Sequence, residues 1–392
     1  MSGFLFVVPP LTGHINPAVG VADRLAARGH RVAWACADPG LVHRLAGSGA
    51  PVFGCAGPVP GGAGVERPPD LRGAEALKFL WEWYLLPLAD AMAPGVRGAV
   101  EEFRPDVVVA DQQAFAGALV AERLGLPWAT SATTSAEFSG AYDGLPKVAE
   151  WLRQRLAELR DRLGDPSATA DPRSSPHLLL VFSSPELVGP QAPSAPHVHY
   201  VGPSLAGRPD QPFPWEWLSP GRAKVLVTLG TANADAGGRF LTACREALRE
   251  RADRVQAVLV DPGGVLPAEE GGKDVLVLPS VPQLALLERM DAVICHAGHN
   301  TVCEALWHGV PLVVAPIRDD QPVIAAQVVD AGAGLRVKFG RVTADRLGTA
   351  LDTVLHDPAH RAAAARVRTA FRAAGGAPAA AAHLERLATE SR

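Results

Sequence analysis

Residues 292–301 read Ala-Val-Ile-Cys-His-Ala-Gly-His-Asn-Thr, and this stretch decides the fold class of the 392-residue chain. Its first four residues are apolar, which predicts a short buried strand over 292–295. The glycine and the polar residues that follow predict a turn that opens a helix. A strand that leads at once through a turn into a helix is typical of βαβ units. The stretch therefore predicts a parallel sheet covered by helices.

The same alternation of apolar runs and amphipathic segments recurs on both sides of this stretch. In the first half we expect strands at 4–8, 31–35, 51–55, 106–110, 128–131 and 178–182. In the second half we expect strands at 224–229, 255–260, 275–278, 292–295, 312–315 and 335–337. The expected fold class is therefore α/β, with two Rossmann-like, doubly wound sheets.

Five prolines between residues 203 and 220 interrupt this alternation and predict a linker. They divide the chain into a domain over 1–205, a linker over 206–222 and a second domain over 223–375. The last segment, 376–392, predicts a C-terminal helix that could pack back on the first domain. Two domains also agree with the usual relation between chain length and domain number.

The charge balance argues against a nucleic-acid partner. Lys and Arg number 37 against 41 for Asp and Glu, a formal net charge of -4, whereas phosphate binding needs a basic surplus. The five cysteines form no CxxC pair, which favours reduced thiols in the cytoplasm. The apolar run at 4–10 is too short for a signal segment or a membrane span. We therefore expect a cytoplasmic protein without a membrane span, and its richness in Ala, Gly and Pro is typical of GC-rich bacteria.

The loop after the first strand holds a candidate general base. It lacks the GxGxxG motif of nicotinamide enzymes and carries His14, ahead of a helix expected from Pro17 with Asn16 as its cap. Histidine titrates close to neutral pH and suits proton abstraction. Asp111 follows the strand at 106–110, at the same edge of the sheet, and would orient the imidazole. A locally packed turn histidine and an Asp that caps the next helix remain alternatives.

In the second half, the turn at 296–301 opens a helix whose first N–H groups can hold a phosphate. Asn300 and Thr301 add polar side chains at that helix end. Glu304 lies one turn deeper, where its carboxylate could accept hydrogen bonds from both hydroxyls of a ribose. A phosphate at the helix tip with a ribose below it predicts a nucleoside diphosphate site.

Two further loops at carboxyl ends of strands could complete this site. The segment 228–231 could place a backbone N–H and the Thr231 hydroxyl beside the phosphates. Asp320 and Gln321 follow the strand at 312–315 and could hydrogen-bond several sugar hydroxyls, although an acidic helix cap is the alternative.

A metal site is the competing interpretation of the 296–301 turn. Two cysteines and two histidines cluster there: Cys295, His296, His299 and Cys303. Their spacing matches no closed Cys/His pattern, and a strand residue and a helix residue rarely converge on one tetrahedral ion. We therefore expect no metal site.

Taken together, these residues resemble the inverting glycosyltransferases of family 1, which include macrolide and plant UGT-like enzymes of the GT-B fold. The resemblance covers nearly the whole chain, and its most specific part is the family's nucleotide-sugar signature: Val281-Pro282-Gln283, His296 to Thr301, Glu304, Gly309-Val310-Pro311 and Asp320-Gln321. It implies two Rossmann-like domains that face each other across a cleft. It also implies a UDP- or dTDP-sugar as co-substrate, with no other cofactor.

The resemblance also implies a role for each matching residue. His14 would deprotonate the acceptor hydroxyl, and Asp111 would orient His14. The donor-binding residues implied are Val281 and Gln283 for the nucleoside, Glu304 for the ribose, His296, Gly298, Asn300, Thr301 and Thr231 for the diphosphate, and Asp320 with Gln321 for the sugar.

Two features of the sequence bear on the donor and on metal dependence. Plant-like members stack a Trp on uracil just before Val281-Pro282, and this chain has Ser280, so both UDP and dTDP stay open. No DxD-type motif lies near the site, so we expect the reaction to proceed without a metal, and the helix N-terminus to stabilise the leaving diphosphate.

The acceptor is expected to bind to the first domain. The segment 71–103 is helical by pattern, in two or three pieces interrupted by Pro87 and Pro94, and the segment 57–70 is a Gly/Pro-rich loop. Aromatic residues gather in the helical segment, and with Phe138 they suggest an acceptor pocket for an apolar natural product: Phe79, Trp81, Trp83 and Tyr84. A core helix is the equally weighted alternative.

Other functions fit the residues less well. A sugar-nucleotide epimerase of the same fold would need further acid/base groups beside the sugar. A non-catalytic partner of a transferase could lose His14, Asp320 or Gln321, and all three are present. The sequence is compatible with a monomer or a homodimer.

Overall fold

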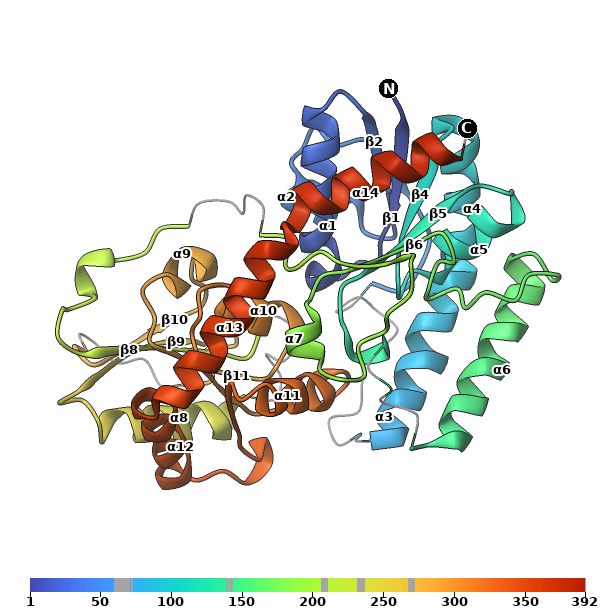
Figure 1. Ribbon diagram of the computed structural model, residues 1–392. Helices are drawn as coiled ribbons and strands as arrows, with labels where there is room; N and C mark the ends of the chain where they lie inside the picture. Colours follow the sequence, from blue (N-terminus) through green and yellow to red (C-terminus); the bar gives the residue numbers. More distant parts are fainter. Residues whose placement is uncertain are drawn as a thin grey trace. The chain divides into compact units, whose positions relative to one another are not determined.

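Two parallel β-sheets, each covered by helices, organise the chain in its computed structural model (Figure 1). The structure describes residues 1–59, 71, 73–138, 140, 144–205, 211–230, 237–266 and 272–391. It divides into unit 1, which comprises Met1–Ser183, Gln191–Arg208 and Ala374–Arg392, and unit 2, which comprises Ser184–Pro190 and Pro209–Ala373. The expected α/β class with two doubly wound sheets is confirmed.

The sheet of unit 1 has its strands in the order β3-β2-β1-β4-β5-β6-β7, all parallel. The strands are β1 (Gly3–Val7), β2 (Arg31–Cys36), β3 (Val52–Gly54), β4 (Val107–Asp111), β5 (Trp128–Ala132), β6 (Leu178–Val181) and β7 (Val198–Tyr200). Because β1 pairs with β2 on one side and with β4 on the other, the strand order reverses at β1. Ligands of open α/β sheets bind at the carboxyl ends of the strands beside such a switch point.

Helices cover both faces of this sheet. They are α1 (Thr12–Ala27), α2 (Pro39–Ala46), α3 (Gly73–Phe79), the π-helix η1 (Leu80–Leu85), α4 (Leu86–Phe103), α5 (Phe115–Arg123), the short η2 (Ala136–Phe138), α6 (Pro146–Leu163) and α14 (Gly376–Glu390). Residues of α4, α5 and α6 pack on one face of the sheet, and residues of α1 and α14 pack on the other. The first β-strands are therefore buried on both sides, as their unbroken apolar sequences require.

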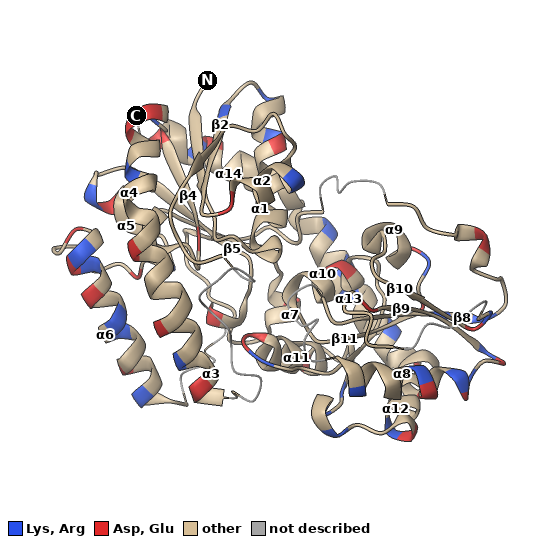
Figure 2. Cartoon of the chain, turned by 180° about the vertical axis from the view of Figure 1, so that it is seen from behind, with Lys and Arg blue, Asp and Glu red and all other residues tan. Residues whose placement is uncertain are grey.

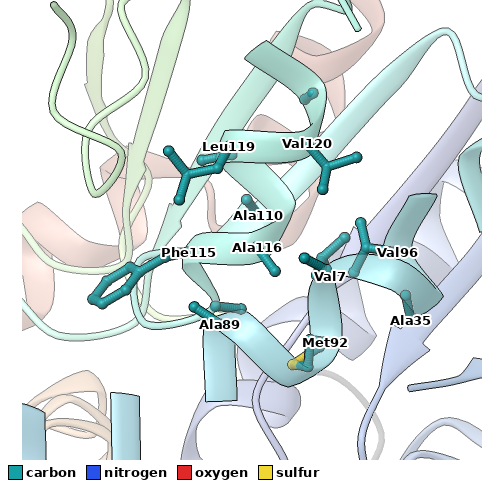
Figure 3. Close-up of a cluster of buried hydrophobic side chains, with 14 of the residues drawn as sticks. Val7, Ala35, Ala89, Met92, Val96, Ala110, Phe115, Ala116, Leu119 and Val120 are labelled. Carbon is teal, nitrogen blue, oxygen red and sulfur yellow. The ribbon is translucent and has the colours of Figure 1, made fainter. Parts of the chain in front are cut away.

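Helix α5 lies close to the two central strands. Figure 3 shows side chains of α4 and α5 gathered over β1 and β4. A Cβ at Gly117 would lie 2.8 Å from Cβ of Val7 and 2.9 Å from Cβ of Ala110, so this approach needs a residue without a side chain. The close packing fixes the short connection between β4 and α5, which begins with Asp111.

The sheet of unit 2 has the strand order β10-β9-β8-β11-β12-β13, which is the dinucleotide-binding order of Rossmann folds. Its strands are β8 (Ala223–Thr228), β9 (Val255–Val260), β10 (Val275–Leu278), β11 (Ala292–Cys295), β12 (Leu312–Val314) and β13 (Gly334–Arg336). Its helices are α7 (Pro185–Val188), η3 (Trp215–Trp217), α8 (Gly238–Arg249), α9 (Gln283–Leu287), α10 (His299–Trp307), α11 (Gln321–Asp330), η4 (Phe339–Arg341), α12 (Ala344–His356) and α13 (Pro358–Ala374). Helices α8 and α12 cover one face, and the switch point lies between β8 and β11.

Charged residues lie mostly on helices and loops, whereas the strands are largely uncharged (Figure 2). Helix α6 carries both signs along its length, including an Arg155–Glu158 pair at 2.7 Å. Within the described residues, no helix combines the length and apolarity that crossing a bilayer requires.

All twelve expected strands occur within one residue of their expected bounds, but two local expectations are wrong and one short strand was missed. Helix α1 begins at Thr12 instead of Pro17, so Asn16 lies inside the helix and does not cap it. The missing N–H of Pro17 removes only the bond to the carbonyl of Gly13, which the first turn tolerates. Helix α4 begins beside Pro87 but continues through Pro94. Strand β7, only three residues long, was not expected at all.

The described part of the expected linker belongs to unit 2, and the C-terminal helix belongs to unit 1. Of the expected linker 206–222, residues 206–210 lie outside the described residues, as do 60–70 of the expected loop at 57–70. The later part is fastened to unit 2, because Gln256 donates from Nε2 to the Trp217 carbonyl at 2.8 Å and accepts from the Ser219 N–H at 2.9 Å. Helix α14 packs in the core of unit 1 through Ala380, Ala381 and Leu384.

Candidate functional site

The candidate base lies at the switch point of unit 1. His14 is in the first turn of α1, directly after β1, and Asp111 is the last residue of β4. Val7 is in register with Ala110 on the neighbouring strand, so both chains leave the sheet at the same level. The sheet order thus brings together two residues that are 97 positions apart in the sequence.

The His14 and Asp111 side chains are in direct hydrogen-bond contact. Nδ1 of His14 lies 2.9 Å from Oδ1 and 3.0 Å from Oδ2 of Asp111. The Asp111 carboxylate is buried, whereas 16% of the His14 side chain is exposed. Since an ionised carboxylate only accepts hydrogen bonds, Nδ1 of His14 carries the proton and the neutral imidazole has its basic lone pair on Nε2.

Two more donors hold the Asp111 carboxylate. The Gln113 backbone N–H donates to Oδ1 at 2.8 Å, and the Thr133 hydroxyl donates to Oδ2 at 3.0 Å. Asp111 therefore also makes the local turn contact that a helix-capping Asp would make, although α5 begins only at Phe115. The capping alternative and the orienting role are compatible, because the carboxylate has two oxygens.

Next to this pair lie three largely buried polar residues, Tyr84, Gln112 and Glu137. The Tyr84 hydroxyl has no hydrogen-bond partner within the described part of the chain, whereas Gln112 and Glu137 lie against each other. Burial raises the pKa of the Glu137 carboxyl, and the guanidinium of Arg173, with Nη1 at 3.8 Å, opposes this rise. Buried polar atoms without partners are rare in folded proteins, so the Tyr84 hydroxyl marks this place as one that calls for an explanation.

The three candidate acceptor residues lie in different surroundings. Trp81 is 2% exposed and packs in the core against Phe115 and Trp151, with ring centroids 5.3 and 6.1 Å away. Trp83 is 61% exposed and stacks on Phe79. Phe138, in η2, is partly buried against a small cluster with Ala132 and Leu179.

In unit 2, the candidate phosphate site lies at the switch point between β8 and β11. His296 follows β11, and its ring is held between two glycines. A Cβ at Gly230, which has φ +68°, would lie 2.8 Å from the ring, and a Cβ at Gly298 would overlap Nε2. The ring can occupy this place only because both neighbours lack side chains.

His296 is buried and neutral. Burial lowers its pKa to about 4, the charge of Arg318 lowers it further, and a hydrogen bond to the Thr228 backbone opposes the change. Its Nδ1 has no hydrogen-bond partner among the described residues. At neutral pH the single ring N–H of His296 donates to the Thr228 backbone, so Nδ1 can accept a hydrogen bond from a ligand, and Arg318 supplies the positive charge beside it.

Helix α10 begins directly after this histidine. Gly298 is its N-cap residue, and Ala297 before it has φ +64°, a left-handed conformation that non-glycine residues adopt only under strain. The N-cap offers no side chain to the first helical N–H groups. Thr301 is buried in the first turn and Asn300 is partly buried, whereas Thr231 lies outside the described residues.

The expected nucleoside residues meet across two helices. Nε2 of Gln283, the first residue of α9, donates to Oε2 of Glu304 on α10 at 2.6 Å. Glu304 is buried and Val281 is partly buried two residues before α9.

The two expected sugar residues differ in orientation. Oε1 of Gln321 accepts hydrogen bonds from the backbone N–H groups of Ile317 and Arg318, at 2.9 and 3.1 Å. The amide of Gln321 therefore shapes the loop after β12 and leaves its NH2 group as the donor for a ligand. Asp320 is the N-cap residue of α11 and follows Asp319, which has φ +56°.

No set of three His, Cys, Asp or Glu side chains in the described ranges could hold a metal ion. Of the four residues in the competing metal-site interpretation, one pair is in contact: Sγ of Cys303 lies 3.5 Å from Nε2 of His299. This pair spans one helical turn.

Sequence reasoning missed several residues that the fold brings to these sites. Thr133 follows β5 and touches both His14 and Asp111. Gln112 and Glu137 lie beside them. Arg318 lies beside His296. The position of Thr133, one residue beyond a strand that neighbours β4, is the signal that could have identified it.

Comparison with known proteins shows which family this chain resembles. The family model "Erythromycin biosynthesis protein CIII-like, C-terminal domain" matches residues 271–387. The chain is 30% identical to the 4'-demethylrebeccamycin synthase of Lentzea aerocolonigenes, over 94% of this chain and 95% of the relative. It is 33% identical to the demethyllactenocin mycarosyltransferase of Streptomyces fradiae, over 96% of this chain and 84% of the relative.

A solved structure shows the same fold. The crystal structure of the glycotransferase of kitacinnamycin superposes with a TM-score of 0.80 at 29% identity and covers 98% of both chains. The structure and the comparisons agree. The structure has two sheets with loops at their switch points, and the relatives align over nearly their whole length. The chain is a glycosyltransferase of the GT-B fold and belongs to the family of the macrolide and other natural-product glycosyltransferases.

Proposed function

We propose that the enzyme transfers a hexose or deoxyhexose from a UDP- or dTDP-sugar to a hydroxyl group of an apolar natural product, with inversion at the anomeric carbon. The observation that carries the proposal is the buried Asp111 carboxylate 2.9 Å from Nδ1 of His14. This contact would hold a neutral His14 in the orientation of a base. A relative of the chain that is named a transferase also supports the proposal.

The base step follows from this geometry. Nε2 of His14 takes the proton of the acceptor hydroxyl while the acceptor oxygen forms a bond to the anomeric carbon. The bond between that carbon and the diphosphate breaks in the same displacement, and the diphosphate leaves with the electron pair. Asp111 stabilises the imidazolium that forms. General base catalysis of this kind contributes about 10²–10⁴-fold to a rate.

The donor's diphosphate would bind at the start of α10. The N–H groups of the first helical turn point at the ligand, and the helix dipole favours negative charge there. Arg318 adds a full positive charge beside His296. Together they stabilise the leaving diphosphate, so we expect turnover to survive EDTA. The residues assigned to the diphosphate are His296, Gly298, Asn300, Thr301 and Thr231.

The rest of the donor would occupy the loops around this helix. Val281 would meet the base through its backbone, and the Gln283–Glu304 pair would bind the nucleoside, with Glu304 on the ribose hydroxyls. Asp320 and the NH2 group of Gln321 would bind the sugar hydroxyls. Because Ser280 stands where plant-like members stack a Trp, the base can be uracil or thymine.

The acceptor would bind to unit 1 beside His14. Exposed Trp83 and partly buried Phe138 offer apolar surface to an acceptor. Trp81 is buried in the core and would support the pocket without touching the acceptor. An apolar pocket distinguishes related shapes by only about 1–3 kcal/mol per methylene, so several related aglycones should be accepted.

The test is a transfer assay with a panel of UDP- and dTDP-sugars and ring-rich natural products, with the anomeric configuration of each product determined by NMR. The proposal predicts an inverted glycoside from at least one pair, and equal turnover with EDTA. His14→Ala should remove most of the activity, whereas His177→Ala, which changes an exposed histidine of the same unit, should not. Retained configuration would contradict the proposal, and an altered sugar nucleotide formed without acceptor would instead support an epimerase.

A second experiment tests the assignment of acceptor binding to the first domain and donor binding to the second. Residues 1–205 can be exchanged with those of a related transferase. The acceptor preference should then follow this first domain, and the donor preference should follow residues 223–375. An acceptor preference that stayed with the second domain would contradict the assignment.

A further inference from the structure

The hydroxyl group of Thr133 lies between the two members of the His14–Asp111 pair. Its Oγ1 is 2.8 Å from Nδ1 of His14 and 3.0 Å from Oδ2 of Asp111. Thr133 is 4% exposed and follows directly after β5, whose Ser131 is in register with Asp111. Three neighbouring strands therefore bring one side chain each to the same point: β1 through α1, β4 and β5.

The possible positions of the protons restrict what this hydroxyl can do. It has one proton, and the carboxylate of Asp111 can only accept, so the Thr133 O–H donates to Oδ2. A lone pair of Oγ1 then faces the Nδ1–H of His14 and shares that proton with the carboxylate. If the Thr133 O–H instead turned to Nδ1, the imidazole would carry its proton on Nε2 and could not act as a base.

The burial of Asp111 increases the energetic importance of its hydrogen bond with Thr133. Asp111 is 1% exposed, so its negative charge depends on the donors around it: Gln113, His14 and Thr133. Buried carboxylates that lose a hydrogen-bond donor attract the remaining donors more strongly. The contact also restrains the imidazole, because Nδ1 is held from two directions.

We propose that Thr133 is a positioning residue of the transfer reaction: it fixes the Nδ1–H tautomer of His14 and the orientation of its ring through Asp111. The inference rests on the proposed role of His14 as the base. It adds a third member to the pair, on a strand that the sequence did not connect with catalysis.

The first measurement compares Thr133→Val with Thr133→Ser. Valine keeps the shape and removes the hydroxyl, and serine restores the hydroxyl. We expect Thr133→Val to lower kcat by about 10- to 100-fold, because small errors in the placement of a catalytic group have effects of this size. The acid limb of its kcat/KM profile should move to higher pH, because the carboxylate, with one donor fewer, favours the protonated imidazole. Thr133→Ser should restore both quantities to within about 3-fold of the parent enzyme.

The second measurement combines Thr133→Val with Asp111→Asn. With an amide at position 111, the Thr133 hydroxyl can donate to Nδ1 and hold the wrong tautomer. Removing the hydroxyl in that background should therefore cost much less than it does alone, or restore some activity. A full multiplicative loss would contradict the proposal, because independent residues add their free energies.

A matched control separates this role from a purely structural one. Thr130 is another buried threonine of β5, and its Oγ1 accepts from the Ser175 N–H at 2.9 Å. Thr130→Val should lower the unfolding temperature but leave the pH profile unchanged. If Thr133→Val does not fold, the tautomer of His14 can be determined instead by NMR of its imidazole nitrogens in Thr133→Ser and in the parent. Both should show the proton on Nδ1, and a proton on Nε2 would overturn the proposal.

Two kinetic results would also overturn it. One is an unchanged kcat and acid limb in folded Thr133→Val. The other is a loss confined to the KM of the sugar nucleotide, which would mean that the hydroxyl touches the donor instead. Full activity in His14→Ala would overturn the proposed function itself, so the two failures are distinguishable.

Discussion

Nε2 of Gln283 donates a hydrogen bond of 2.6 Å to Oε2 of Glu304, which joins the start of α9 to the first turns of α10. The two residues belong to separate parts of the sequence signature, and the contact shows how the fold makes them one unit. Gln283 supplies one hydrogen-bond donor to the buried Glu304 carboxylate and so restrains its orientation.

Loss of Glu304 should therefore weaken nucleoside diphosphates that carry a ribose. We expect Glu304→Gln to reduce affinity about 10-fold or more, since hydrogen bonds to charged groups are worth about 1.5–3 kcal/mol. Gln283→Ala should have a smaller effect in the same direction. Calorimetric titration with UDP measures both effects, and dTDP, whose deoxyribose has only the 3′-hydroxyl, should lose less affinity. Inorganic pyrophosphate, which has no sugar, should bind the variants and the parent equally.

Gly298 should be required because of the His296 ring and not because of its backbone. Its φ of -63° suits any residue, but a Cβ would overlap Nε2 of His296. Gly298→Ala should displace the ring and weaken nucleotide binding as much as His296→Ala does. In a His296→Ala background, Gly298→Ala should have little further effect. Equal losses in both backgrounds, measured by the same titration, would show that the glycine acts independently of the ring.

The burial of His296 should make the protein less stable in mild acid. Its folded pKa, about 4, lies below the unfolded value of 6.5, so the unfolded state binds more protons and stability falls as pH drops through that window. At about pH 5 this amounts to roughly 2 kcal/mol for a fully buried group. Urea unfolding at about pH 7.5 and pH 5 should show a smaller drop for His296→Ala than for the parent. An equal drop would mean that His296 does not titrate in this way.

Arg318 should contribute charge to diphosphate binding. Its guanidinium lowers the pKa of His296, and its backbone N–H is fixed by Gln321. Arg318→Gln should weaken UDP and dTDP about 10-fold at low salt and less at high salt, because salt screens charge. Arg289→Gln removes a guanidinium that lies 4.4 Å from the ring of Trp215, and it serves as the control that should leave affinity unchanged.

The sequence was sufficient for the sheets because buried parallel strands are largely apolar, and β11 begins and ends where its apolar run does. The short β7 has no such run. The contacts of His14 with Asp111 were expected because both follow central strands. The contacts of Thr133 and Arg318 were not, because single polar residues in loops have no periodicity, and only the three-dimensional fold shows what they touch.

The central claim is that His14 removes the proton of the acceptor hydroxyl, and a single-turnover rate tests it most directly. With donor and acceptor both saturating, His14→Ala should transfer sugar about 10²–10⁴ times more slowly than the parent, and its affinity for the nucleotide should be unchanged. The exposed-histidine control His177→Ala should react at the parental rate. A parental single-turnover rate in folded His14→Ala would contradict the account.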